Sequence, residues 1–202
     1  MLGIPPVLIA YASWLVFVLT WNVFDRPATT VATLPARRER LHSLVISLGL
    51  VLLVLAPATL VKGRMWVNPP LLDGTMLLVM AAGIAWCWWA RRHLGRLWSA
   101  AVMRQEAHRV VDTGPYRFVR HPIYTGFIVM YVGMAIISTS VLAFVAVPLI
   151  ALGLWLKARV EEQFLIEELG PVAYEAYKAR TPMLAPRIQR RSKTDLTVGR
   201  PT

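Results

Sequence analysis

The longest apolar stretch of the chain, from Ile123 to Leu156, constrains the fold more than any other feature. As one helix it would be about 50 Å long at ~1.5 Å per residue, whereas the hydrocarbon core of a bilayer is about 30 Å thick. We therefore expect the chain to reverse at the polar interruption 138–140. Pro148 would kink the second arm, where neighbouring helices can cover the carbonyl group that it frees. The stretch thus predicts two spans that form a tight helical hairpin.

Three further apolar stretches raise the number of predicted transmembrane helices to about five. Hydrophobic residues make up 56% of the 202 residues, which is typical of a polytopic membrane protein and not of a soluble domain. The predicted fold class is all-α, with one integral membrane domain over residues 1–190, a cytoplasmic C-terminal helix, and a basic disordered tail over 191–202. The predicted spans are approximately 5–24, 41–61, 71–90, 121–137 and 141–158.

The basic residues predict the orientation in the membrane. All Lys and Arg residues except Lys62 and Arg64 fall on one side of the five-span topology. The positive-inside rule makes that side cytoplasmic and places the N-terminus outside. We expect an inner (plasma) membrane protein of a bacterium, with its active site and C-terminus in the cytoplasm.

The net charge of +11 would also suit a nucleic-acid-binding protein. The basic residues, however, lie between and after the apolar stretches, where they would face anionic lipid headgroups. We therefore expect membrane lipids and no nucleic acid as partners. The four histidines lack the helical spacing of metal ligands, and the single cysteine, Cys87, excludes a multi-cysteine site, so no metal is expected.

A first polar cluster precedes the hairpin, where the segment 114–126 reads G-P-Y-R-F-V-R-H-P-I-Y-T-G. Its opening glycine and proline favour a turn that directs Tyr116 towards the hairpin mouth. Pro122 suits the first turn of a helix, so His121 would lie beside free backbone N–H groups that attract anions, and Tyr124 shares that end. One interpretation is a ligand site, and the other is a set of basic residues that anchor the helix at the headgroups.

A second polar cluster, Glu161 and Glu162, follows the hairpin one helical turn from the membrane. Glu161 either accepts hydrogen bonds from a ligand or pairs with Lys157 at the i,i+4 spacing on a solvated helix face. Lys157 or Arg159 is a candidate for holding an anionic substrate headgroup. We expect the two polar clusters to meet at the inner leaflet.

Together these motifs resemble those of the isoprenylcysteine carboxyl methyltransferase family, part of a wider group of integral membrane methyltransferases that includes phospholipid methyltransferases. The resemblance covers roughly Arg91 to Pro186, and its order and spacing make it specific. The matching segments are R-R-H-L-G-R-L-W-S (91–99), H-R-V-V-D-T-G-P-Y (108–116), R-H-P-I-Y-T-G (120–126), E-E-Q-F-L (161–165) and L-G-P-V-A-Y-E-A-Y (169–177), followed by Pro182 and Pro186.

This resemblance implies S-adenosyl-L-methionine as methyl donor and a lipophilic acceptor that enters from the bilayer. The eukaryotic members of the family have an arginine where this chain has Lys157, which keeps the charge but loses the bidentate fork that suits a carboxylate. Lys157, Arg159 and Glu161 are expected to position the substrate. The implied cofactor-binding residues are His108, Val110, Val111, Tyr116, His121, Pro122, Tyr124, Glu161 and Glu162.

Methyl transfer from a sulfonium requires alignment of the reactants and exclusion of water, with no metal and no covalent enzyme intermediate. The sequence offers no convincing dedicated base, which favours an acceptor that is already anionic. A carboxylate is expected first, as in isoprenylcysteine O-methylation, with a thiol or a lipid amine as further possibilities. Two other functions stay open, namely a nicotinamide-dependent membrane reductase and a non-catalytic lipid-binding membrane protein.

Overall fold

A computed structural model describes residues 5–23, 32–33, 36–59, 66–95, 103–104 and 110–186. This part of the chain is almost wholly helical, in agreement with the predicted all-α class. Two short antiparallel strands, β1 (Ala32–Thr33) and β2 (Met103–Arg104), pair with each other. The α-helices are α1 (Pro6–Val23), α2 (Ala36–Thr59), α3 (Pro70–Leu94), α4 (Pro122–Ser138), α5 (Val141–Leu169) and α6 (Pro171–Arg180), with a 3₁₀ helix, η3 (Gly114–Arg117), before α4.

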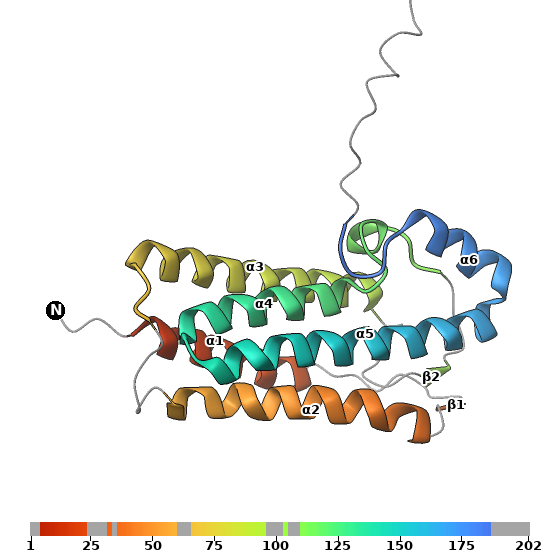
Figure 1. The fold of residues 1–202 in the computed structure, drawn as a ribbon. Helices are drawn as coiled ribbons and strands as arrows, with labels where there is room; N and C mark the ends of the chain where they lie inside the picture. Colours follow the sequence, from red (N-terminus) through yellow and green to blue (C-terminus); the bar gives the residue numbers. More distant parts are fainter. Residues whose placement is uncertain are drawn as a thin grey trace, which may run out of the picture.

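The first five helices form an elongated bundle (Figure 1). Helices α1, α3 and α5 run in one direction and α2 and α4 in the other. Helix α6 and η3 lie together at one end of the bundle, drawn at the right, while the chain enters α1 at the opposite end. The described parts of the segments that carry the sequence motifs therefore gather at the α6 end.

Three of the described helices are long and apolar enough to cross a membrane, over Arg40–Ala58, Pro70–Leu94 and Val141–Glu167. The apolar segments Pro6–Trp21 and Pro122–Ser138 are shorter. Each of the five predicted spans thus corresponds to an apolar helix, and three of these helices reach spanning length. Helix α5 has 29 residues and is about 43 Å long at ~1.5 Å per residue, so it extends beyond a hydrocarbon core of about 30 Å.

The chain reverses between α4 and α5 at the polar interruption noted in the sequence. Thr139 adopts the left-handed conformation with φ 48°, and its N–H donates to Ala135 O at 3.2 Å, which ends α4. The packing differs from the tight hairpin expected, because α4 packs mainly against α3 and α5 mainly against α2.

Glycines at both of these interfaces explain the difference in packing. A Cβ atom added at Gly126 of α4 would lie 2.4 Å from Cys87 Sγ and 2.9 Å from Gly83 O of α3. A Cβ atom at Gly153 of α5 would lie 2.5 Å from Ile46 of α2. Close backbone approach through small residues is a usual basis of helix association in membranes, where apolar side chains gain little by leaving lipid.

Replacing Gly126 by Ala should therefore separate α3 from α4. We expect the Gly126→Ala variant to lose about 1–3 kcal/mol of stability, the usual effect of overpacking a core, measured as a lower thermal unfolding midpoint in detergent. Gly74→Ala on α3 is the matched control, because a Cβ atom there meets nothing within 4 Å. Equal stability of the two variants would contradict this account of the α3–α4 interface.

Candidate functional site

The two polar clusters of the sequence meet at the α6 end of the bundle. The Tyr124 hydroxyl donates to Glu161 Oε1 at 2.5 Å. His121 Nε2 lies 3.1 Å from Glu162 Oε1, and His121 Nδ1 lies 3.5 Å from Glu161 Oε2. The start of α4 and the last third of α5 are thereby joined by a compact network of ionisable side chains.

The start of α4 positions His121 and Tyr124. Pro122 is the first residue of α4, and His121 before it has the non-helical dihedrals φ −122° and ψ 65°. The imidazole ring stacks on the Tyr124 ring with centroids 5.4 Å apart and an interplanar angle of 5°. Proline at a first helical turn therefore turns the histidine back over its own helix, towards the two carboxylates of α5.

The two adjacent glutamates have different surroundings. Glu162 is buried and accepts hydrogen bonds from His121 and from Arg120 Nε, which lies 2.7 Å from Glu162 Oε1. The Glu161 side chain is 20% exposed, and its Oε1 is 3.9 Å from Lys157 Nζ. Glu161 is therefore the carboxylate that remains within reach of a small molecule.

His121 lies between the two carboxylates and responds to both. Burial lowers its pKa by desolvating the imidazolium, but the hydrogen bonds to Glu161 and Glu162 outweigh burial and raise the pKa above its ordinary value. Both ring nitrogens of a protonated histidine are donors, which matches the carboxylate on each side of the ring. The site thus holds an imidazolium cation between two anions over more of the neutral pH range than an isolated histidine would.

The turn before α4 positions Tyr116 as predicted. Gly114 has φ 56°, and a Cβ atom there would lie 2.6 Å from the His93 ring, which stacks on Tyr116 with centroids 6.3 Å apart. Tyr116 is buried, packs near Val111 and Tyr124, and has its pKa raised by burial, so its phenol stays neutral. The structure therefore places the Tyr116 ring, with the His93 ring stacked on it, beside the ionisable network.

The remaining predicted residues lie at different distances from this network. Val110 is half-buried next to Val111, whereas His108 lies outside the described residues. Arg159 is exposed, with its guanidinium 5.3 Å from the Trp155 ring centroid. Because two residues correspond to about 200° around a helix, Arg159 projects from the face of α5 opposite Glu161. The structure thus brings Lys157, and not Arg159, to the network.

A segment that the sequence analysis did not assign to the site lies against the start of α4. We call residues 181–184, which follow α6, the C-terminal strap. The backbone N–H of Arg120 donates to Pro182 O at 2.8 Å, and that of His121 donates to Met183 O at 3.1 Å. The only signal for this contact in the sequence is Pro182, which is part of the motif pattern.

Arg91 of α3 is a second residue whose position the sequence did not reveal. Its guanidinium is buried, lies 4.4 Å from the Trp21 ring centroid and 5.6 Å from that of Trp88, and donates to Trp21 O at 2.5 Å. Trp21 packs in the same cluster as Tyr116 and Tyr124. Arg91 therefore helps to attach the cluster that contains Tyr116 to α1.

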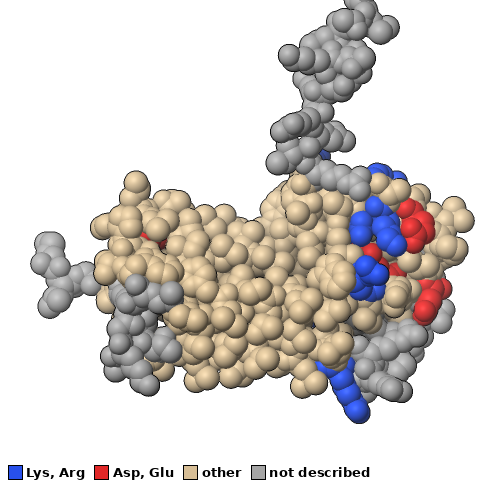
Figure 2. All heavy atoms as spheres, in the orientation of Figure 1, with Lys and Arg blue, Asp and Glu red and all other residues tan. Residues whose placement is uncertain are grey.

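Charged side chains gather at the α6 end of the bundle, and the long sides of the bundle carry almost none in this view (Figure 2). Among the described residues, no group of three or more His, Cys, Asp or Glu side chains could hold a metal ion.

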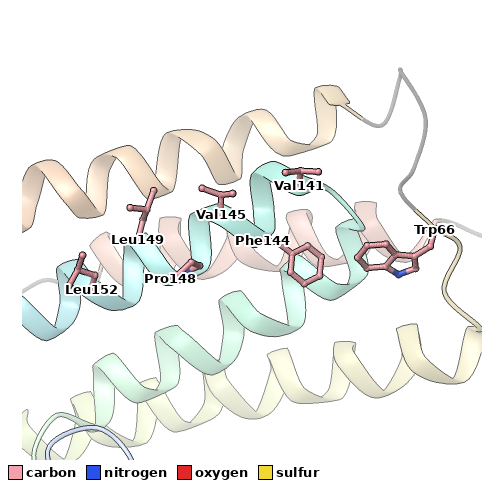
Figure 3. A pocket seen from close by; sticks show the side chains of 7 residues that line it. All are labelled: Trp66, Val141, Phe144, Val145, Pro148, Leu149 and Leu152. Carbon is pink, nitrogen blue, oxygen red and sulfur yellow. The ribbon is translucent and has the colours of Figure 1, made fainter.

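An apolar groove of about 620 Å³ lies on α5 away from the ionisable network (Figure 3). At one end is Trp66, whose indole N–H donates to Asn68 Oδ1 at 2.7 Å. The α5 residues that line the groove are Val141, Phe144, Val145, Pro148, Leu149 and Leu152.

The fold and this network define an integral membrane protein with an ionisable site at one end of its helix bundle. Residues 75–167, which include α4 and both glutamates, match the family model "Isoprenylcysteine carboxyl methyltransferase (ICMT) family". The resemblance seen in the motifs is thereby confirmed over this stretch of the chain.

Similar proteins include methyltransferases of more than one kind. The chain is 41% identical to Methanethiol S-methyltransferase 1 of Bradyrhizobium diazoefficiens over 35% of this chain and 24% of that protein. It is 33% identical to Protein-S-isoprenylcysteine O-methyltransferase of Schizosaccharomyces pombe over 44% of this chain and 37% of that protein. It is also 33% identical to Cobalt-zinc-cadmium resistance protein CzcN of Cupriavidus metallidurans over 61% of this chain and 52% of that protein. The chain spans about half the length, or less, of these relatives.

The raised pKa of His121 makes the stability of the protein pH-dependent. Because the pKa is higher in the folded state, the stabilisation is complete below the unfolded-state pKa of about 6.5 and is lost as the pH rises through the folded-state pKa. Thermal unfolding in detergent from pH 6 to 9 should therefore show that the wild type gradually loses its advantage over His121→Asn. Parallel curves for the two proteins would contradict this assignment.

Replacing Glu162 by Gln should destabilise the protein, because the buried Arg120 guanidinium would lose its carboxylate. We expect a loss of about 3–5 kcal/mol, the range for breaking a buried ion pair by removing one partner. Glu175→Gln is the control, because Glu175 pairs with Lys178 at an exposed position and should change stability by about 0–1 kcal/mol. Denaturation of both variants in detergent would test this, and a similar small effect for each would refute a buried pair.

Proposed function

We propose that this protein transfers the methyl group of S-adenosyl-L-methionine to a lipophilic acceptor that arrives from the bilayer. The observation that carries the proposal is that the family match covers the same α4–α5 network in which Tyr124 and His121 contact Glu161. Two of the relatives described above are named as methyltransferases. Neither the reductase nor the non-catalytic alternative draws support from the family match.

The chemistry of the network suits this cofactor. Glu161 is partly exposed and anionic, so it can accept from the cofactor's hydroxyl or ammonium groups or face its positive sulfonium. The neutral ring of Tyr116 offers an apolar surface next to it for a flat base. Val111 and Pro122 would add apolar contacts, and Glu162 would act through His121.

The cofactor supplies an electrophilic methyl group, and the protein's contribution is to align and desolvate the reactants. Alignment of this kind can lower a barrier by roughly 7–11 kcal/mol. Tyr124 holds Glu161 by donating to Oε1, and His121 holds the opposite oxygen, so the carboxylate is fixed before any ligand binds. Such preorganisation avoids the cost of ordering these side chains during the reaction.

We propose an anionic acceptor, with a carboxylate as the first candidate. The Lys157 ammonium group lies on the same face as Glu161 and 5.8 Å from the Tyr124 ring centroid, where it can attract an anionic group. A thiolate is the second candidate, because of the similarity to Methanethiol S-methyltransferase 1. Neither acceptor needs a dedicated base.

We also propose that the α6 end faces the cytoplasm of a bacterium and that the protein lies in the inner membrane with its N-terminus outside. Support comes from the basic side chains at the α6 end and from the positive-inside rule. Anionic lipid headgroups would then contact these side chains, so membrane lipids are proposed as partners.

Calorimetry with purified protein in detergent tests the proposed cofactor. We expect S-adenosyl-L-methionine to bind, and Glu161→Gln or Tyr124→Phe to weaken binding by about 10- to 100-fold, the effect of losing a hydrogen bond to a charged group. Glu175→Gln, on the exposed side of α6, should leave the affinity unchanged. Absence of binding to the wild type, with NADPH binding in its place, would establish the reductase alternative.

Incubation with methyl-labelled cofactor and bacterial membrane lipids identifies the acceptor. A carboxylate acceptor gives a methyl ester that mild base hydrolyses to labelled methanol, whereas a methylated thiol or amine keeps the label. We expect base-labile product, and at least about a tenfold loss of kcat/KM for Lys157→Ala, because a charged contact to the acceptor is removed. Base-stable label would replace the carboxylate by the thiol or amine.

A further inference from the structure

Arg120 makes several contacts that are directed away from Glu161. Its Nε donates to Glu162 Oε1 at 2.7 Å, and its Nη1 donates to Lys178 O at 3.2 Å and to Thr181 O. The side chain is only 7% exposed. A planar guanidinium with five donors can hold a carboxylate and backbone carbonyls in one fixed geometry, which a lysine cannot do.

The same contacts attach the C-terminal strap to the start of α4. The N–H groups of Arg120 and His121 donate to carbonyls of the strap, and Thr125 Oγ1 donates to Leu184 O at 2.6 Å. Helix α6 is tied to the same region, because the Tyr177 hydroxyl donates to Tyr116 O at 2.7 Å. The strap is therefore hydrogen-bonded to the segment 120–125 at three of its residues.

Arg120 and His121 share one oxygen of Glu162. Both Arg120 Nε and His121 Nε2 are within hydrogen-bonding distance of Oε1, at 2.7 Å and 3.1 Å. Rotation of the Glu162 carboxylate would therefore disturb the imidazole ring, and with it the stacked Tyr124. This arrangement couples Arg120 to Glu161 through two intermediate side chains.

We propose that Arg120 is a positioning residue for the methyl-transfer site: it orients His121 through Glu162 and holds the C-terminal strap over the start of α4, so that Glu161, and not Glu162, faces the ligand. The role as a positioning residue for a cofactor rests on the proposed function. The coupling between Arg120, His121 and the strap is a property of the protein alone.

The charges around His121 give this proposal a measurable signature. His121 faces Glu161 and Glu162 from α5, Arg120 from its own segment and Tyr124 from α4; Lys157 lies beyond Glu161, and the buried Tyr174 of α6 lies near Glu162. Without the positive charge of Arg120, the two carboxylates would stabilise the imidazolium of His121 and would favour its protonated form more strongly. The titration of His121 should then move to higher pH.

Two substitutions separate the charge of Arg120 from its fork of donors. Arg120→Lys keeps the charge and loses the fork, and Arg120→Gln loses both. Arg117→Gln is the matched control, because Arg117 is exposed and lies over the Phe118 ring at 4.4 Å. The experiment uses the full chain in detergent with S-adenosyl-L-homocysteine as the probe, and histidines labelled with ¹³C in their rings, with His121→Asn to assign the signal.

Three measurements are made on each variant: the NMR titration of His121, hydrogen–deuterium exchange of residues 120–121 and 177–181, and the affinity for the probe. We expect Arg120→Gln to move the His121 titration upward and Arg120→Lys to leave it in place. Both Arg120 variants should increase hydrogen–deuterium exchange in the strap region. Both should also weaken binding of the probe by about 10- to 100-fold, the effect of losing a hydrogen bond to a charged group. The control should match the wild type throughout.

Other outcomes overturn the proposal in distinguishable ways. A loss of probe affinity with unchanged His121 titration and unchanged exchange would mean that Arg120 contacts the cofactor directly. Variants that match the wild type in all three measurements would remove any positioning role. If the wild type itself does not bind the probe, the proposed function fails, while the titration and exchange still decide the coupling of Arg120 to His121 and the strap.

Discussion

The contact between His121 and the two glutamates of α5 is the interaction on which the rest of the site depends. Buried ionisable groups are stable only when opposite charges and hydrogen bonds replace the water that they have lost. Here each of the two carboxylates contacts one nitrogen of the imidazole ring. The carboxylates in turn are stabilised by further contacts with Arg120, Tyr124 and Lys157. The start of α4 cannot shift relative to α5 without breaking this balance.

The packing of the bundle allows that contact without making α4 and α5 close partners. Glycines let α4 approach α3 and let α5 approach α2, so each arm is fixed by another helix. The ionisable network then joins two helix pairs at one end, where α5 extends beyond the length of a hydrocarbon core. Packing by small residues along the helices and ionic contacts at their end thus have separate tasks.

Much of this arrangement could be predicted from the sequence, because it follows from local rules. The reversal at 138–140 follows from the length of an apolar run, and the place of His121 follows from the proline after it. The helix partners could not be predicted, since the close approach at Gly126 depends on which backbone lies opposite. The strap could not be predicted either, because its contacts to Arg120 and His121 use backbone carbonyl groups that any residue provides.

The position of the strap in the chain has a consequence for biogenesis. Residues 181–184 follow all the helices that the structure describes, so they leave the ribosome only after the carboxylate pair of α5 has been synthesised. During that interval Arg120 has the carboxylate of Glu162 but lacks the carbonyl group of Thr181, to which its Nη1 donates in the folded protein. The strap can therefore attach to the start of α4 only after the five helices of the bundle have been synthesised.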